Sequence, residues 1–171
     1  MSREDFYRIE KKNGIATIWV HIKKEKMNIV SPDLIQYFDE IYTELNDDDT
    51  VRAGVLISDR KDFIAGADIK AFKAEKKGDF TPTLKKGHLC LNALENAKKP
   101  IIAAIHGTAY GFGTELSLAC HGRVCSDDPK TKFGLPEVKL GLLPGGGGTQ
   151  RLPRLVGLQK SLDMMLTGKN I

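Results

Sequence analysis

The segment that most constrains the fold is residues 101–151, where short apolar runs alternate with glycine-rich turns and two glutamates. IIAAIHG predicts a buried strand, because it is a short apolar run that ends at glycine. GFGTELSLACHG predicts a glycine turn and then a helix, with Glu115 in its first turn. The same order returns in KFGLPEVKLGLLPGGGGTQ, where Glu137 lies between apolar neighbours and Thr149 is expected to cap a helix. Glu115 and Glu137 are therefore the candidate reacting groups.

The first third of the chain predicts a hairpin, a helix and a strand. Asn13-Gly14 separates two alternating runs and supplies the positive backbone angles that a two-residue turn needs. Ser31 is expected to cap a helix with Pro32 at its first position. The apolar residues of this helix recur at helical spacing: Leu34, Ile35, Phe38, Ile41, Tyr42 and Leu45. VRAGVLIS, residues 51–58, then predicts a buried strand.

The remaining segments complete an alternation of strands and helices. A short helix is expected after the turn at Gly66, and residues 75–87, EKKGDFTPTLKKG, are expected to form an exposed loop. Residues 88–99 predict a helix that Pro100 stops. Residues 149–157 and 158–167 predict two short helices before Gly168, the second with Leu158, Leu162, Met165 and Leu166 on one face. This order predicts an α/β domain with helix-covered sheets.

Length, charge and cysteine content set limits on the function. The 171 residues suffice for one domain, spanning 1–171, that needs no metal or disulfide to be stable. The net charge of +4 is modest and dispersed, which suits a ligand carrying phosphates and does not require nucleic acid. Cys90, Cys120 and Cys125 form an odd set, and no signal peptide or membrane-length apolar run is apparent. Reduced thiols and a cytoplasmic location are expected.

Three other functional motifs are set aside. The run Gly145–Gly148 lacks the Lys-Ser/Thr that should complete a phosphate-binding loop. Cys120, His121 and Cys125 lack the paired spacing of a zinc site, so no metal is expected. Ser117 lies within a helical pattern, which is unlike the strained elbow of a serine hydrolase.

The two glutamates carry a stronger signal together than either does alone. A single first-turn Glu is commonly explained by the helix dipole, and a Glu after proline by solvent exposure. Here each carboxylate lies among apolar residues beside a glycine turn, where backbone amides can approach a ligand. Partly buried carboxylates can move a proton and steer a water, and backbone amides can hold a negatively charged oxygen. Chemistry through an enolate is the predicted reaction class.

Three blocks of the sequence resemble the conserved blocks of the crotonase superfamily of enoyl-CoA hydratases and isomerases. They are FIAGADIKAF, IHGTAYGFGTELSLACHGRV and FGLPEVKLGLLPGGGGTQRLPRLVG. The chain is most similar to the hydratase region of the multifunctional fatty acid oxidation members. The resemblance implies a crotonase-like ββα spiral, a trimer-type homo-oligomer or a complex with dehydrogenase and thiolase activities, and an acyl-CoA substrate without a cofactor. It also implies that this chain is a core domain without the C-terminal helices of the family.

The resemblance further implies a role for each matching residue. Glu137 would deliver a proton to the alpha carbon of a 2-trans-enoyl-CoA, and Glu115 would orient and activate the water that is added. The backbone amides of Ala67 and Phe112 would hold the thioester oxygen, and Gly145 would help to place the water. CoA would be bound at Ala65, Ala67 and Lys70, with Lys26 as a weaker candidate, although a lone surface lysine is most often only solvated.

One position departs from the family pattern. The turn before the first glutamate is usually G-G-G, whereas this sequence has Gly111-Phe112-Gly113. If residue 112 needs a backbone angle unfavourable for Phe, the strain would be on the order of 1–3 kcal/mol. Weaker activity or an altered chain-length preference is then expected. Thr114 is expected to cap the helix.

Two alternatives to hydration stay open. A Δ3,Δ2-enoyl-CoA isomerase would share the fold and the oxyanion-binding amides, but isomerisation needs only one acid, so the pair of glutamates favours hydration. A catalytically weak acyl-CoA-binding or assembly fragment is the second alternative, because family members continue beyond this length.

Overall fold

The chain begins with a hairpin at the edge of its main sheet. The computed structural model describes residues 3–23, 25–68 and 81–171. After the 3-10 turn η1 (Arg3–Asp5), strands β1 (Tyr7–Lys12) and β2 (Ile15–Val20) pair antiparallel, with Lys12 opposite Ile15. Asn13 and Gly14 have φ angles of 54° and 79°, as a two-residue hairpin turn requires. The predicted hairpin is confirmed.

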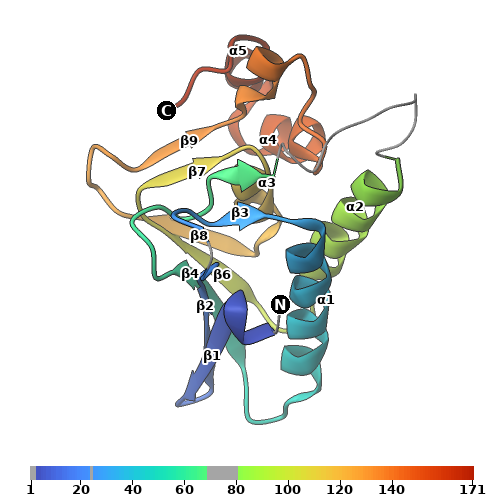
Figure 1. The fold of residues 1–171 in the computed structure, drawn as a ribbon, viewed down its shortest axis with the longest axis vertical. Helices are drawn as coiled ribbons and strands as arrows, with labels where there is room; N and C mark the ends of the chain where they lie inside the picture. The colour runs from blue at the N-terminus through green and yellow to red at the C-terminus, as the bar shows by residue number, and fades with distance from the viewer. Residues whose placement is uncertain (1–2, 24, 69–80) are drawn as a thin grey trace.

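The strands form two layers that are joined in a spiral (Figure 1). The main sheet has the order β1-β2-β4-β6-β8, and every pair after the hairpin is parallel. Its later strands are β4 (Ala53–Ser58), β6 (Ile101–Ile105) and β8 (Gly122–Cys125). The second layer consists of short parallel pairs, β3 (Ile29–Val30) with β5 (Gly66–Ala67) and β7 (Thr108–Tyr110) with β9 (Lys132–Gly134). A bridge between Ile64 and Ala109 links the two pairs.

Each turn of the spiral contains a long strand, a short strand and a helix. The helices are α1 (Pro32–Asp47), α2 (Thr81–Glu95) and α3 (Phe112–Ala119). Helices α1 and α2 lie side by side along one side of the main sheet (Figure 1). The α/β fold and the ββα spiral are confirmed.

Helix α1 forms where its apolar spacing and its cap predict it. The Ser31 hydroxyl accepts a hydrogen bond from the Leu34 amide at 3.3 Å. All six apolar residues predicted for this helix are buried, and they pack against the inward residues of the main sheet. Burial of such a side chain contributes roughly 1.5–3 kcal/mol, so this one face is sufficient to fix the helix on the sheet.

Helix α2 differs from the predicted helix at both ends. It begins at Thr81, inside the segment expected to be a loop, and ends at Glu95, before Pro100. Pro82 fits the first turn of a helix because the amide it lacks has no intrahelical acceptor there. The buried face of α2 consists of Gly87, Cys90, Leu91 and Leu94. The lysines and the glycine in its first half, which suggest a loop in the sequence, therefore belong to a helix that packs on one side only. The short helix expected after Gly66 lies largely outside the described residues, as do residues 75–80 of the expected loop.

The last segments are η3 (Pro136–Leu140), α4 (Gly148–Val156) and α5 (Leu158–Thr167), followed by Gly168 with φ 63°. The two predicted helices are confirmed, but Thr149 is not a cap. Helix α4 begins at Gly148 and has no side-chain cap, because the residue at its N-cap position is Gly147, which has no side chain and adopts φ 96°. On α5 the predicted apolar face is largely exposed: Leu158, Leu162 and Leu166. The buried residues of α5 are Ser161 and Met164.

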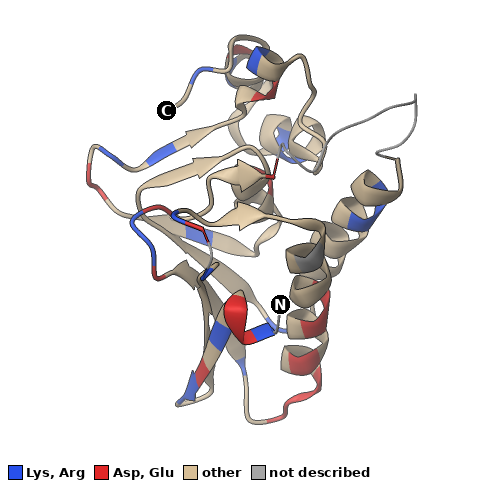
Figure 2. Cartoon of the chain, viewed as in Figure 1, with Lys and Arg blue, Asp and Glu red and all other residues tan. Residues whose placement is uncertain are grey.

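Charged residues are dispersed along the chain in Figure 2, with acidic residues gathered at the C-terminal end of α1 and in the turn after it. Within the described ranges, no helix combines the length and apolar character needed to cross a membrane.

Candidate active site

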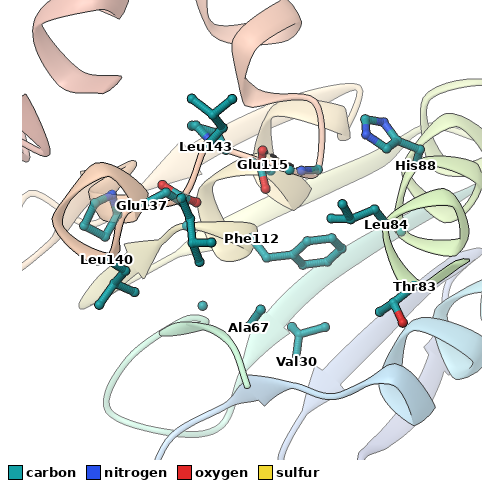
Figure 3. Close-up of a pocket in the computed structure, with 18 of the residues that line it drawn as sticks. Val30, Ala67, Thr83, Leu84, His88, Phe112, Glu115, Glu137, Leu140 and Leu143 are labelled. Atoms are coloured by element: carbon teal, nitrogen blue, oxygen red, sulfur yellow. Dashed lines mark hydrogen bonds between the residues drawn. The ribbon is translucent and has the colours of Figure 1, made fainter. Parts of the chain in front are cut away.

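Both predicted glutamates face one cavity of about 600 Å³. The cavity lies between α2, β5, the start of α3 and the segment 136–146 (Figure 3). Most of its lining is apolar, and the labelled members in Figure 3 are Val30, Ala67, Thr83, Leu84, His88, Phe112, Glu115, Glu137, Leu140 and Leu143. The spiral therefore brings together two carboxylates that the sequence separates by β8, β9 and the loops that join them.

Glu115 is held by the glycine turn that precedes α4. Its side chain is 2% exposed, and Oε1 accepts hydrogen bonds from the amides of Gly146 and Gly148, each at 2.8 Å. The pKa of Glu115 is raised to about 7, chiefly by burial and to a smaller extent by the nearby Glu137 carboxylate. The two amides and Arg151 act in the opposite direction, because they stabilise the ionised form. A carboxyl group with a pKa near neutral can exchange a proton at working pH.

Glu137 lies in the first turn of η3 and points into the same cavity (Figure 3). Its Oε2 atom is buried and has no hydrogen-bond partner among the described residues. Burial raises its pKa above the ordinary value. A Cβ placed on Gly111 would lie 3.0 Å from Glu137 Oε1, so glycine at 111 keeps this carboxylate close to the start of α3. The buried oxygen is thus available to a ligand.

The turn before Glu115 places its unusual backbone angle at Gly111, with φ 52° and ψ −123°. Phe112 follows as the first residue of α3, and among the described non-glycine residues only Asn13 has a positive φ. The expectation of strain at Phe112 is therefore wrong, because Gly111 adopts the angle that a side chain would resist. The Phe112 amide opens the helix and so has no intrahelical acceptor.

The Phe112 ring fills the space between two glycines. It is 8% exposed, and a Cβ on Gly87 would lie 3.5 Å from its Cε2 atom. A Cβ on Gly146 would lie 3.1 Å from Cδ2. Figure 3 shows the ring pointing toward Leu84 of α2. The ring is therefore a wall of the cavity beside Glu115.

The remaining predicted site residues divide into three groups. Ala65, Ala67 and Gly145 line the cavity. Lys26 is exposed and outside the lining, and Lys70 lies outside the described residues. The described part of the lining contains no Lys or Arg that could bind a phosphate.

The residues that hold Glu115 were not predicted from the sequence. The amides that bind it belong to Gly146 and Gly148, and the four-glycine run was the signal for them. Thr114, expected to cap α3, instead donates its hydroxyl proton toward the carbonyls of Ala109 at 2.6 Å and Gly134 at 2.9 Å. Its side chain thereby ties the start of α3 to β7 and β9.

The cysteines, His121 and Ser117, which were set aside as functional groups, are free thiols or make hydrogen bonds to the backbone. Cys90, Cys120 and Cys125 are free thiols, and burial raises the pKa of Cys90 and of Cys120 to about 12. His121 Nδ1 accepts from the Ile101 amide at 3.2 Å, and the Ser117 hydroxyl donates to the Thr114 carbonyl at 2.7 Å. Among the described residues, no group of three or more His, Cys, Asp or Glu side chains could hold a metal ion.

Comparison with known proteins gives concordant results. The "Fatty acid oxidation complex subunit alpha" of Shewanella sp. (strain ANA-3) is 51% identical over 97% of this chain, which spans 24% of that relative's length. An enoyl-CoA hydratase structure from Geobacillus kaustophilus HTA426 superposes with a TM-score of 0.92 at 33% identity, covering 99% of this chain and 64% of that one. The enoyl-CoA hydratase of Bacillus anthracis gives a TM-score of 0.88 at 31% identity, with 96% and 64% covered. Residues 10–171 match the enoyl-CoA hydratase/isomerase family, and the chain belongs to that family.

Proposed function

We propose that this chain catalyses the addition of water to a 2-trans-enoyl-CoA, giving the 3-hydroxyacyl-CoA. The observation that carries the proposal is the pair of glutamates in one mostly apolar cavity, one fixed by two amides and the other with an unpartnered buried oxygen. The relative with 51% identity is named for fatty acid oxidation, which supports an acyl thioester as the substrate.

The proposed reaction uses the two carboxylates in different ways. A water held between Glu115 and Glu137 adds its oxygen to C3, while Glu115 orients it and takes its proton. Glu137 gives a proton to C2 on the same face of the double bond, so the overall addition of H and OH is syn. The water proton then replaces the one that Glu137 donated, and the two carboxyl groups return to their starting state. No oxidant or cofactor is required.

The negative charge that develops on the thioester oxygen would be stabilised by backbone amides. Ala67 lies on the cavity wall at β5, and Phe112 offers its amide at the start of α3. The helix start also supplies a partial positive charge at this point. In a mostly apolar cavity, such donors stabilise an enolate more strongly than they would in water.

Assembly and location belong to the same proposal. The name of the Shewanella relative, a fatty acid oxidation complex subunit, supports a place in a complex. Dehydrogenase and thiolase activities in that complex, which would consume the product, are part of the proposal. A trimer-type homo-oligomer and a cytoplasmic location are proposed with it.

The test is the loss of enoyl-thioester absorbance with crotonyl-CoA, measured for the wild type and for Glu115→Gln and Glu137→Gln. Each variant should lose at least about 100-fold in turnover, because each removes one general acid or base. Glu10→Gln, an exposed carboxylate on β1, is the matched control and should keep the wild-type rate. Full activity in both site variants would contradict the two-carboxylate mechanism.

A second assay separates the family's two reactions. Conversion of 3-enoyl-CoA to 2-enoyl-CoA without hydration would identify an isomerase, and it would survive in one of the two glutamate variants. Binding of acyl-CoA without either reaction would identify a catalytically weak binding module.

A further inference from the structure

Arg151 reaches from α4 back to the glycine turn that holds Glu115. Its Nη1 donates to the Gly146 carbonyl at 3.1 Å, and its side chain is 12% exposed. Both backbone polar groups of Gly146 are therefore hydrogen-bonded: its amide donates to Glu115 and its carbonyl accepts from Arg151. The guanidinium and the carboxylate are joined through a single residue.

The other nitrogens of Arg151 are fixed to α2. Nε and Nη2 donate to Glu95 Oε2 at 3.1 and 2.8 Å, and Nη2 also donates to Asn92 Oδ1 at 2.9 Å. Because the guanidinium is a rigid planar fork, these bonds fix the direction in which Nη1 points. Arg151 thus connects α2 to the turn between η3 and α4.

The turn itself depends on this approach. Gly147 adopts φ 96°, and a Cβ on it would collide with Arg151 Nη1. Helix α4 has no side-chain cap at its start, so the backbone conformation of the turn alone orients the Gly148 amide that donates to Glu115. The guanidinium occupies the space that a side chain at 147 would fill.

We infer that Arg151 is a positioning residue for Glu115, because it clamps the Gly146 carbonyl against α2 and so holds the two amides that fix the carboxylate. The inference rests on the proposed function for its kinetic readout. Arg154 on the same helix makes no such contact, since among the described partners it donates only to the carbonyl and the side chain of Gln150.

The charges around Glu115 give the sign of a pH effect. Glu137 faces it from η3, Arg151 from α4, and α2 contributes His88 on the cavity wall and Glu95 paired to Arg151. On β7 the Tyr110 hydroxyl is bonded to Asn170, and β5 presents only backbone and Ala67. Arg151 is the cation in this set that lowers the pKa of Glu115. Removing it should raise that pKa, so the acid limb of the rate profile should move to higher pH.

The experiment compares Arg151→Gln, Arg151→Lys and the matched control Arg154→Gln, which removes the same charge from the same helix. With crotonyl-CoA, Arg151→Gln should lower kcat by about 10- to 100-fold, as expected for a displaced catalytic group, with KM changed less than about threefold. Arg151→Lys should recover part of kcat, because one ammonium cannot reproduce the fork. Arg154→Gln should retain the wild-type kcat and pH profile. Circular dichroism of each variant checks that a loss of kcat does not come from unfolding.

Two results would overturn the inference: wild-type kcat and pH profile in Arg151→Gln, or equal losses in Arg151→Gln and Arg154→Gln. A measurement that does not depend on turnover tests the role of Arg151 separately from the proposed hydratase function. The Glu115 carboxyl resonance, ¹³C-labelled and assigned with Glu115→Gln, should titrate at higher pH in Arg151→Gln than in the wild type or in Arg154→Gln. An unchanged titration would refute the positioning role even if the chain hydrated no substrate.

Discussion

Replacing Glu115 with glutamine should stabilise the folded protein at pH 8 while it removes activity. Glutamine keeps an oxygen at the position of Oε1, where it can accept from the amides of Gly146 and Gly148. The substitution removes the capacity of the group to carry a buried negative charge, and it places an amide NH2 at the position of Oε2. Stability and catalysis are therefore expected to change in opposite directions at this residue.

The magnitude follows from the pKa of the carboxyl group. Burial raises the Glu115 pKa from 4.5 to about 7. Below pH 4.5 the group is protonated in the folded and the unfolded protein, and its ionisation affects neither. Between pH 4.5 and 7 the unfolded chain ionises first, so the wild type loses stability as the pH rises. By linkage this loss reaches about 3 kcal/mol above pH 7, and Glu115→Gln does not undergo it.

The assay is urea unfolding of both proteins at pH 4.5 and at pH 8. The gain in unfolding free energy of Glu115→Gln over wild type should be larger by about 3 kcal/mol at pH 8 than at pH 4.5, or about 6–12 °C in Tm. Glu10→Gln on exposed β1 should show no such difference. A Glu115→Gln variant that is destabilised equally at both pH values would refute the reasoning. Such a result would mean that ionisation of the buried Glu115 carboxyl does not destabilise the folded protein.

Three further substitutions test the packing around the site. Phe112→Gly should lower the unfolding free energy by about 3 kcal/mol through the cavity it leaves, and should raise the kcat/KM ratio of decenoyl-CoA to crotonyl-CoA; an unchanged ratio would contradict a role for the ring in chain length. Gly87→Ala should raise Tm by stabilising α2 by up to about 1 kcal/mol, since its Cβ meets the ring at an ordinary 3.5 Å. Gly113→Ala should yield little folded protein on expression, because its Cβ would collide with the Ile64 carbonyl.

Elements with local signals were predictable from the sequence. The Asn13-Gly14 turn determines its own geometry, and Ser31 with the apolar spacing after it defines α1 without reference to the rest of the chain. Helix α2 lacks such signals in its first half. Glycine, proline and lysines dominate there, and only the partners of Gly87 inside the folded protein explain why that residue is buried in a helix.

The site was predictable in its residues but not in its connections. Glu115 and Glu137 could be selected because each lies among apolar residues beside a glycine turn. That they share one cavity depends on the parallel pairing of β7 with β9, which no pattern within either strand specifies. The link from Arg151 through Gly146 to Glu115 joins three elements, and its middle member is a backbone group that leaves no side-chain signature.

The glycines around the two carboxylates provide space more than unusual backbone angles. Gly146 and Gly148 do not have positive φ, but a Cβ on Gly146 would lie 2.5 Å from Glu115 Oε2 and one on Gly148 would lie 3.0 Å from Oε1. Their role is to let backbone amides reach a buried carboxylate, which a side chain would prevent. The requirement for a positive φ falls on Gly111 and Gly147 instead. This division explains why Phe can occupy position 112: the amide and the adjacent φ are preserved, and the ring is accommodated where Gly87 and Gly146 have no side chains.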